Sequence, residues 1–463
     1  MNHTVNEDYF EKLNFSEAPR VTVAPPGPKA RDLLNRQAKV DSQVLTYPAM
    51  VPLAPDKGLG ATLKDVDGNC FIDLSGGVGV LNVGHSHPDI TAAIKEQADK
   101  LVHGLDFPGE ARVQMSEKMA AIAPEGLKNN CKVFLCAPTG TDAVESATKL
   151  AKYNSKKPTI IAFEGGWHGV TGAGLATSGK KGIRKDFLPV MPEVYHAPYA
   201  YCYRCAFGKT YPSCDLQCAR FLEHAIKDPD GSANDPGCVI IEPIQGEGGI
   251  VIPPDEYLKE VRRICDEYGL ILIMDEIQTG FGRTGSMFAC DRLGITPDIV
   301  TASKTMGGGL PVASILFKKE LDTWKPGAHV GTFRGNSLSC ASGLAAINVI
   351  EDTGLCERSA RLGASALERL KAIADKSRFI GDVRGKGLFI GMEFVHDKKT
   401  KAPAPELLQK TVSKCFQEGV MLWKSGRWNN VGRMMPALVI TEGLLDTAID
   451  IFEEAYYAIE KES

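Results

Sequence analysis

Short apolar runs alternate with amphipathic segments along the middle of the chain. Six runs have strand length and are rich in Val, Ile and Leu; they cover residues 133–136, 159–163, 238–244, 270–274, 299–302 and 312–317. Apolar residues recur at helical spacing in other stretches, such as residues 88–101, 111–122 and 142–153. This alternation predicts an α/β fold in which helices cover a mostly parallel sheet, and we expect this large domain to span residues 86–345.

The amino-terminal part has a different pattern. Residues 1–60 are interrupted by prolines, including the run Pro25-Pro26-Gly27-Pro28, which predicts an extended arm that wraps another surface. Residues 61–73 predict a hairpin with a turn at Asp67-Gly68. We therefore assign residues 1–85 to an arm and to part of a smaller domain.

The carboxyl-terminal part, residues 346–463, predicts the rest of that smaller domain. It contains two long helical patterns, at residues 357–376 and 444–460, and apolar segments around residues 387–394 and 431–440. A mixture of this kind is typical of an α+β domain.

Composition and charge narrow the class of protein without identifying it. The chain has 463 residues, of which 43% are hydrophobic and 24% are charged, and its formal net charge is −4. These values are ordinary for a globular protein and favour neither nucleic acid nor a membrane surface as a partner. The first eight residues are polar and acidic, unlike a signal peptide, and no apolar stretch approaches the roughly 20 residues that span a bilayer. We expect a cytoplasmic protein.

Two apolar runs each deliver one ionisable side chain at the carboxyl end. Asp275 ends the run 270–274, and Lys304 follows the run 299–302 and leads into Gly307-Gly308-Gly309. Open α/β sheets bind ligands at this end of their strands. A lysine can form a Schiff base with the aldehyde of pyridoxal phosphate (PLP), and an acid can keep its ring nitrogen protonated. From this pair alone, an acid at the edge of the core and a solvated lysine remain an equal alternative.

A phosphate group needs backbone donors, and one segment can supply them. Gly140 and Thr141 follow a predicted strand and open a predicted helix, whose free N–H groups can hold an anion. The alternative is a simple helix cap, in which Thr139 or Thr141 caps the helix and Glu145 closes a capping box.

Two further segments lie at predicted strand ends. Trp167 follows a Gly-Gly turn and precedes His168, and this aromatic residue can stack on a cofactor or be buried in the core. The segment 242–249 carries Glu242 and Glu247 among Gly and Pro residues, which predicts a loop shaped for close contact.

The order of these segments, each at a strand end, resembles the class III (subgroup II) aminotransferases of PLP fold type I. The resemblance spans nearly the whole chain. Its most specific blocks are Glu242-Pro243-Ile244-Gln245-Gly246-Glu247-Gly248-Gly249, Asp275-Glu276-Ile277-Gln278-Thr279-Gly280-Phe281-Gly282-Arg283-Thr284-Gly285 and Ser303-Lys304, and it extends from Asp73-Leu74-Ser75-Gly76-Gly77 and Asn82-Val83-Gly84-His85 to Val431-Gly432-Arg433-Met434.

The resemblance implies a role for each matching residue at the cofactor. Lys304 and Asp275 match the catalytic lysine and the partner of the ring nitrogen. The other residues expected at PLP are Gly140, Thr141, Trp167, His168, Glu242, Gln278 and Thr332. Thr332 matches a threonine that reaches the phosphate of the neighbouring subunit's cofactor, which implies a homodimer with shared active sites, or a tetramer built from such dimers.

The resemblance also implies the substrate-binding residues Val78, Glu247 and Arg433. Arg433 can bind the α-carboxylate of one substrate with two hydrogen bonds. When a substrate without that carboxylate enters, Glu247 can neutralise the arginine, so that no unpaired charge is buried.

The implied activity is transfer of the amino group of an ω-amino acid or similar amine to 2-oxoglutarate or pyruvate. The donor stays open among 4-aminobutyrate, 2,4-diaminobutyrate, β-alanine, taurine and related amines. Val170 stands where 4-aminobutyrate enzymes have an arginine, which weakens a strict assignment to that donor. The alternative is an amino-acid racemase or 2-epimerase on the same scaffold.

Four cysteines depart from the family pattern. They form a thiol cluster in the sequence, at Cys202, Cys205, Cys214 and Cys218. Their spacing is compatible with a zinc or iron–sulfur site, with free thiols or with disulfides. We assign no metal to the active site and expect a structural role for this cluster.

Overall fold

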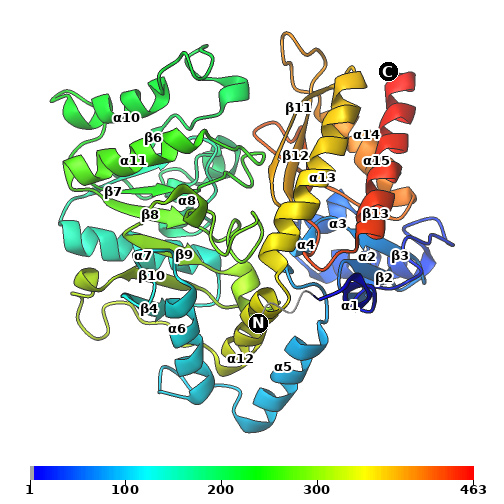
Figure 1. The fold of residues 1–463 in the computed structure, drawn as a ribbon, viewed down its shortest axis with the longest axis horizontal. Coiled ribbons are helices and arrows are strands. Elements are labelled where there is room, and N and C mark those ends of the chain that lie inside the picture. Colours follow the sequence, from blue (N-terminus) through cyan, green and yellow to red (C-terminus); the bar gives the residue numbers. More distant parts are fainter. Residues whose placement is uncertain (1–4) are drawn as a thin grey trace. The chain divides into compact units, whose positions relative to one another are not determined.

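The computed structural model describes residues 5–463; residues 1–4, the start of the polar amino terminus, lie outside the described part. The chain divides into two compact units, which are coloured along the sequence in Figure 1. The large unit is Ala92–Asn348, and the small unit combines the chain up to Thr91 with Val349–Ser463.

The large unit is built on a seven-stranded sheet with the order β4-β10-β9-β8-β7-β5-β6. All strands run parallel except β10, which is antiparallel to both β4 and β9. The strands are β4 (Cys131–Leu135), β5 (Thr159–Phe163), β6 (Val194–Ala197), β7 (Pro236–Ile241), β8 (Ile271–Asp275), β9 (Ile299–Ala302) and β10 (Ser314–Lys318). The expected α/β fold with a mostly parallel sheet is confirmed. The edge strand β6 was not predicted, because its residues are only partly buried and carry little apolar signal.

Helices surround this sheet (Figure 1). They are α6 (Glu110–Ile122), α7 (Gly140–Ser155), α8 (Gly172–Thr177), α9 (Lys181–Arg184), α10 (Gln217–Lys227) and α11 (Asp255–Tyr268), with α12 (Ser337–Asp352) at the boundary and short 3-10 turns η1 (Lys185–Phe187), η2 (Cys202–Arg204), η3 (Asp291–Leu293), η4 (Lys304–Gly307) and η5 (Lys319–Leu321). Helix α7 packs in the centre, where its buried Ala143, Ala147 and Ala151 share one core with Ile240 and Ile273 of the sheet. Small side chains on this face let the helix approach the strands closely. The start of α7 is thereby fixed near the strand ends.

The small unit contains two four-stranded sheets, in the orders β1-β2-β3-β13 and β11-β12-β15-β14. Its strands are β1 (Pro55–Leu59), β2 (Thr62–Asp65), β3 (Cys70–Asp73), β11 (Ile380–Lys386), β12 (Phe389–Phe394), β13 (Val420–Met421), β14 (Trp423–Ser425) and β15 (Val431–Met434). Its helices are α1 (Glu7–Glu11), α2 (Pro28–Val40), α3 (Tyr47–Met50), α4 (Gly76–Gly79), α13 (Leu355–Lys376), α14 (Pro405–Gln417) and α15 (Glu442–Glu462), with α5 (Pro88–Lys100) spanning the boundary to the large unit. The parallel pairing of β13 with β3 joins the two ends of the chain in one unit.

The interpretation of residues 1–60 as an extended arm was wrong over Pro28–Val40, which form α2. Pro28 is compatible with the first position of a helix. The carboxylate of Asp67, in the turn of the β2–β3 hairpin, accepts hydrogen bonds from the backbone N–H groups of Lys29 (2.9 Å) and Ala30 (2.8 Å). This cap comes from almost 40 residues away, so no local pattern announces the helix. The hairpin itself forms as expected, with Gly68 at a φ of +91° in its turn.

Among the described residues, no helix combines the length and the apolar character that crossing a membrane requires.

Candidate active site

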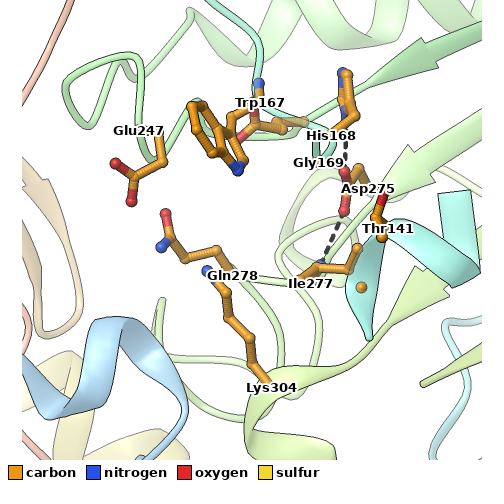
Figure 2. Close-up of a pocket in the computed structure, with 11 residues that line it drawn as sticks. Thr141, Trp167, His168, Gly169, Glu247, Asp275, Ile277, Gln278 and Lys304 are labelled. Carbon is orange, nitrogen blue, oxygen red and sulfur yellow. Dashed lines mark hydrogen bonds and ion pairs between the residues drawn. The ribbon is translucent and has the colours of Figure 1, made fainter. Parts of the chain in front are cut away.

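The neighbouring parallel strands β8 and β9 end at the same edge of the sheet. Asp275 is the last residue of β8, and Lys304 follows β9 after a single intervening serine. Both side chains line one cavity of about 170 Å³ (Figure 2). The cavity is lined by Gly140, Thr141, Trp167, His168, Gly169, Glu242, Glu247, Asp275, Ile277, Gln278 and Lys304. All of these residues belong to the large unit.

Lys304 occupies a strained backbone position. Its φ of +52° lies in the left-handed region, which a residue with a side chain seldom adopts. The 3-10 turn η4 begins at this residue, and the side chain extends into the cavity toward Gln278 (Figure 2). Strain of this kind persists where the surrounding structure holds a functional side chain in one direction.

The carboxylate of Asp275 is held on both oxygens. Oδ2 lies 2.6 Å from Nδ1 of His168, while Oδ1 accepts hydrogen bonds from the hydroxyl of Thr301 (2.9 Å) and the N–H of Ile277 (3.1 Å). Burial is the largest single influence on His168 and disfavours its charge, but the hydrogen bond to Asp275 and the charges of Asp275 and Glu242 together outweigh burial and raise the pKa of the imidazole. Asp275 is therefore a fixed, buried acid whose orientation depends on His168.

The start of α7 forms a cradle for an anion. The side chain of Asp142 accepts a hydrogen bond from the N–H of Thr139 (2.9 Å) in a capping box, and Gly140 and Thr141 face the cavity. Gly169, at a φ of +115°, packs so closely on Thr141 that a Cβ there would overlap its hydroxyl. The capping box expected with Glu145 is instead closed by Asp142, because that residue lies three positions after the cap.

Glu145 holds a different part of the structure. Its Oε1 accepts hydrogen bonds from the N–H groups of Ala173 (2.6 Å) and Gly174 (3.4 Å) at the start of α8. The hydroxyls of Thr141 and Thr171 lie 2.8 Å apart and join the same two segments. These contacts fasten the segment before α8 to the first turns of α7.

Glu242 positions Trp167 at the cavity. Its carboxylate accepts hydrogen bonds from the N–H groups of Trp167 (2.8 Å) and Gly246 (2.9 Å). Burial raises the pKa of Glu242 to about 7; the charge of Asp275 acts in the same direction and that of His168 opposes it. Glu247 is half-buried and Gln278 is buried at the same cavity.

Three expected residues lie outside the set that lines this cavity. Val78, half-buried at a φ of +60°, and Arg433, on β15 and 3% exposed, belong to the small unit. Thr332 is exposed in the large unit. Their roles toward substrate and cofactor stay predictions.

Sequence reasoning missed several residues that shape the site. Gly169 and Ile277 line the cavity, and Thr301 and Thr171 bond to residues that do. The position of Gly169, directly after His168, was a usable signal. No signal pointed to the contact of His168 with Asp275, because the two residues are 107 positions apart.

The thiol cluster lies away from this cavity. All four cysteines are free and line a second, small cavity with Tyr199 and Tyr201. Burial raises the pKa of the Cys218 thiol to about 11, and Cys202 and Cys214 add to that effect. As the side chains lie, no three or more His, Cys, Asp or Glu residues within 5–463 are grouped so that they could hold a metal ion.

A lysine and a buried acid at neighbouring strand ends, above an anion cradle, define an enzyme of PLP fold type I. The family model of the class-III aminotransferases matches residues 46–456, and the chain belongs to this family. Members of this family depend on PLP.

Individual relatives cover most of the chain. It is 37% identical over 421 residues to the diaminobutyrate–2-oxoglutarate aminotransferase of Rhizobium meliloti, covering 89% of this chain and 90% of that one. It is 34% identical over 446 residues to the alanine/serine racemase of Pyrococcus horikoshii, covering 95% and 93%. An aminotransferase structure from Bacillus anthracis superposes with a TM-score of 0.85 at 27% identity, covering 93% and 99%.

The residues of the cavity fit PLP. The N–H groups and hydroxyl at Gly140 and Thr141 suit its phosphate. A Cβ on Gly140 would lie 3.0 Å from the side chain of Ile277, which would have to shift to make room. Asp275 suits the ring nitrogen, and Trp167 supplies an aromatic wall. When bound, PLP supplies an electron sink for the amino group that is transferred.

Proposed function

We propose that this enzyme transfers the amino group of an ω-amino acid, or a similar amine, to 2-oxoglutarate or pyruvate. The observation that carries the proposal is the convergence of Lys304 and Asp275 on one cavity, together with Glu242 and Glu247. The relationship to a diaminobutyrate–2-oxoglutarate aminotransferase supports the class of donor and the acceptor.

Each residue of the cavity has a defined task in this proposal. The amine of Lys304 takes the proton from the carbon atom that loses it and returns it to the carbon atom that receives it. Asp275 would pair with the ring nitrogen, and His168 holds its carboxylate in place for that contact. Trp167, fixed by Glu242, covers the reacting atoms and limits the entry of water.

The two substrates must bind in turn, and Glu247 and Arg433 account for this. In the proposal, Arg433 binds the α-carboxylate of the amino acid formed from the oxo acid, and Glu247 neutralises it when an ω-amine occupies the site. Val78 lines the same substrate space. Val170, next to Gly169 and 57% exposed, offers no charge to a distal carboxylate, which weakens a strict assignment to 4-aminobutyrate. The relationship to a diaminobutyrate–2-oxoglutarate aminotransferase favours 2,4-diaminobutyrate as the donor.

The proposal also covers the oligomeric state and the cellular location of the enzyme. We propose a cytoplasmic homodimer in which Thr332 of each subunit reaches the phosphate of the other subunit's cofactor. The exposure of Thr332 is compatible with a contact to a second copy. The partners are small molecules, an amine donor and a 2-oxo acid.

Racemisation is the second candidate function, and the similarity to an alanine/serine racemase favours it. A racemase uses the same lysine and the same electron sink, but returns the proton to the carbon that lost it. The two reactions differ in whether the amino group leaves the substrate.

A panel of amines, offered with 2-oxoglutarate or pyruvate, tests the proposal. We expect formation of glutamate or alanine, with 2,4-diaminobutyrate among the best donors. In the absence of an oxo acid, a good donor should bleach the absorbance of bound PLP, which racemisation leaves unchanged. Inversion of L-alanine or L-serine without any transfer product would show that the protein is a racemase and would contradict the proposed aminotransferase activity.

A further inference from the structure

The segment between β6 and α10 contains little regular structure (Figure 1). Within residues 202–215, no side chain is buried, and the regular structure is limited to the 3-10 turn η2. Surface contacts such as the ring pair Phe207–Phe221 and the hydrogen bond from Tyr211 to Glu256 contribute little free energy. A bound metal ion or a disulfide is one way to hold a segment that buries so little apolar surface.

The backbone brings the four thiols to one place. Cys202 begins the turn η2 and Cys205 directly follows it. The chain then reverses at Gly208, which has a φ of +64° and donates its N–H to the carbonyl of Cys205 (3.1 Å). Cys214 lies in a second turn, closed by its own N–H to the carbonyl of Thr210 (2.9 Å). Cys218 lies in the first turn of α10.

One cavity of about 20 Å³ is lined by all four thiols of the cluster. A space of this size holds roughly one water molecule, so it suits a single ion and is too small for an iron–sulfur cluster. Four cysteine sulfurs around one ion are the ligand set of structural zinc.

We propose that the thiol cluster binds one Zn²⁺ ion as a structural site. Binding releases four protons, one from each thiol, and leaves a Zn(Cys)₄ centre with a net charge of −2. As the side chains lie, the four cysteines do not form a group that could hold an ion, so binding requires their side chains to rotate toward the cavity that they already line. With four protein ligands the ion has no open position, and it therefore takes no part in catalysis.

The proposed zinc site is also connected to the active site through Tyr199. Tyr199 lines the thiol cavity, and its hydroxyl donates hydrogen bonds to the carbonyls of Glu242 (3.0 Å) and Pro243 (3.2 Å). Glu242 in turn holds Trp167 at the substrate cavity. Ordering of the thiol cluster therefore helps to stabilise the segment around Glu242, which positions Trp167.

Metal analysis of the holoenzyme, purified without added metal, tests the proposal directly. We expect about one zinc per chain and iron at background. The variant Cys202→Ser should lose most of that zinc; Cys202 is the exposed member of the cluster, so this change disturbs packing least. The matched control is Cys356→Ser, a partly buried cysteine of α13 outside the cluster, which should keep its zinc.

A second measurement reports on the loop itself. After treatment with a chelator, proteases should cut within residues 202–215 at least tenfold faster, and zinc chloride, but not magnesium chloride, should restore protection. A wild-type enzyme without zinc above background, or with iron and labile sulfide in its place, would overturn the proposal. Disulfides among the four cysteines in freshly purified enzyme, or full zinc content in Cys202→Ser, would also overturn it.

Discussion

Nδ1 of His168 lies 2.6 Å from Oδ2 of Asp275, and both side chains are buried. The two residues come from the turn after β5 and from the end of β8. A buried carboxylate requires hydrogen-bonding groups that face it, and His168 lies at one of its oxygens. His168 is therefore a positioning residue for the acid beneath the cofactor ring.

Replacing His168 by Gln should reduce the rate of amino transfer by tenfold to about a hundredfold, since hydrogen bonds to charged groups contribute about 1.5–3 kcal/mol. The decline should appear in kcat more than in KM, because substrate contacts are untouched. The pH dependence of the absorbance of bound PLP should shift in the variant and be unchanged in a surface substitution such as Lys259→Ala. An unshifted titration in His168→Gln would contradict the role.

Lys304→Ala should retain PLP without a covalent bond and lose turnover by at least a thousandfold. Reduction with borohydride followed by mass spectrometry checks this expectation: the wild type should gain the mass of the cofactor on the peptide that contains Lys304, and the variant should not. Lys259→Ala, on the exposed face of α11, serves as the control and should behave like the wild type. Substantial retained transfer in Lys304→Ala would refute the assignment.

Glu242 should make stability depend on pH. Its pKa is about 7 in the folded state against 4.5 for an ordinary glutamate, so the folded state binds the proton more tightly. Protonated Glu242 therefore makes its full contribution to the free energy of unfolding below pH 4.5, and this contribution is lost as the pH rises to about 7. The loss amounts to roughly 3 kcal/mol at most.

Urea unfolding of the cofactor-free wild type and of Glu242→Gln measures this contribution. The free energy of unfolding of the wild type, relative to the variant, should fall between pH 4.5 and 7 and level off above that range. Groups that titrate independently of Glu242 cancel in this difference. A difference that rises with pH would show that Glu242 is ionised in the folded state.

The hydroxyls of Thr141 and Thr171, which lie 2.8 Å apart, should contribute to binding of the cofactor's phosphate and not to binding of its ring. Thr171→Val removes one hydroxyl, and we expect about fivefold weaker binding of PLP, since a hydrogen bond contributes about 1 kcal/mol. Binding of pyridoxal, which lacks the phosphate, should change little. Thr171→Ser should restore most of the affinity for PLP, whereas equal losses for both ligands would indicate a general loss of structure.

Local patterns were sufficient for the main elements of the large unit. The apolar runs at β5 and β9 match the observed strands over Thr159–Phe163 and Ile299–Ala302, because buried parallel strands are continuous apolar segments. The helix α2 was missed, since its cap is the side chain of Asp67, which lies far away in the chain. Propensity cannot register a partner that only the folded chain supplies.

The site residues at the strand ends could be predicted from the sequence for a physical reason. Asp275 and Lys304 directly follow apolar runs, and parallel strands bring their carboxyl ends to one edge, so both were expected at one site. Tertiary structure alone decided which groups touch: His168 on Asp275, Glu242 on the N–H of Trp167, and Glu145 on the start of α8. Such contacts join positions that are far apart in the chain, and they form only when the packing of α7 and the strands sets the distances between them.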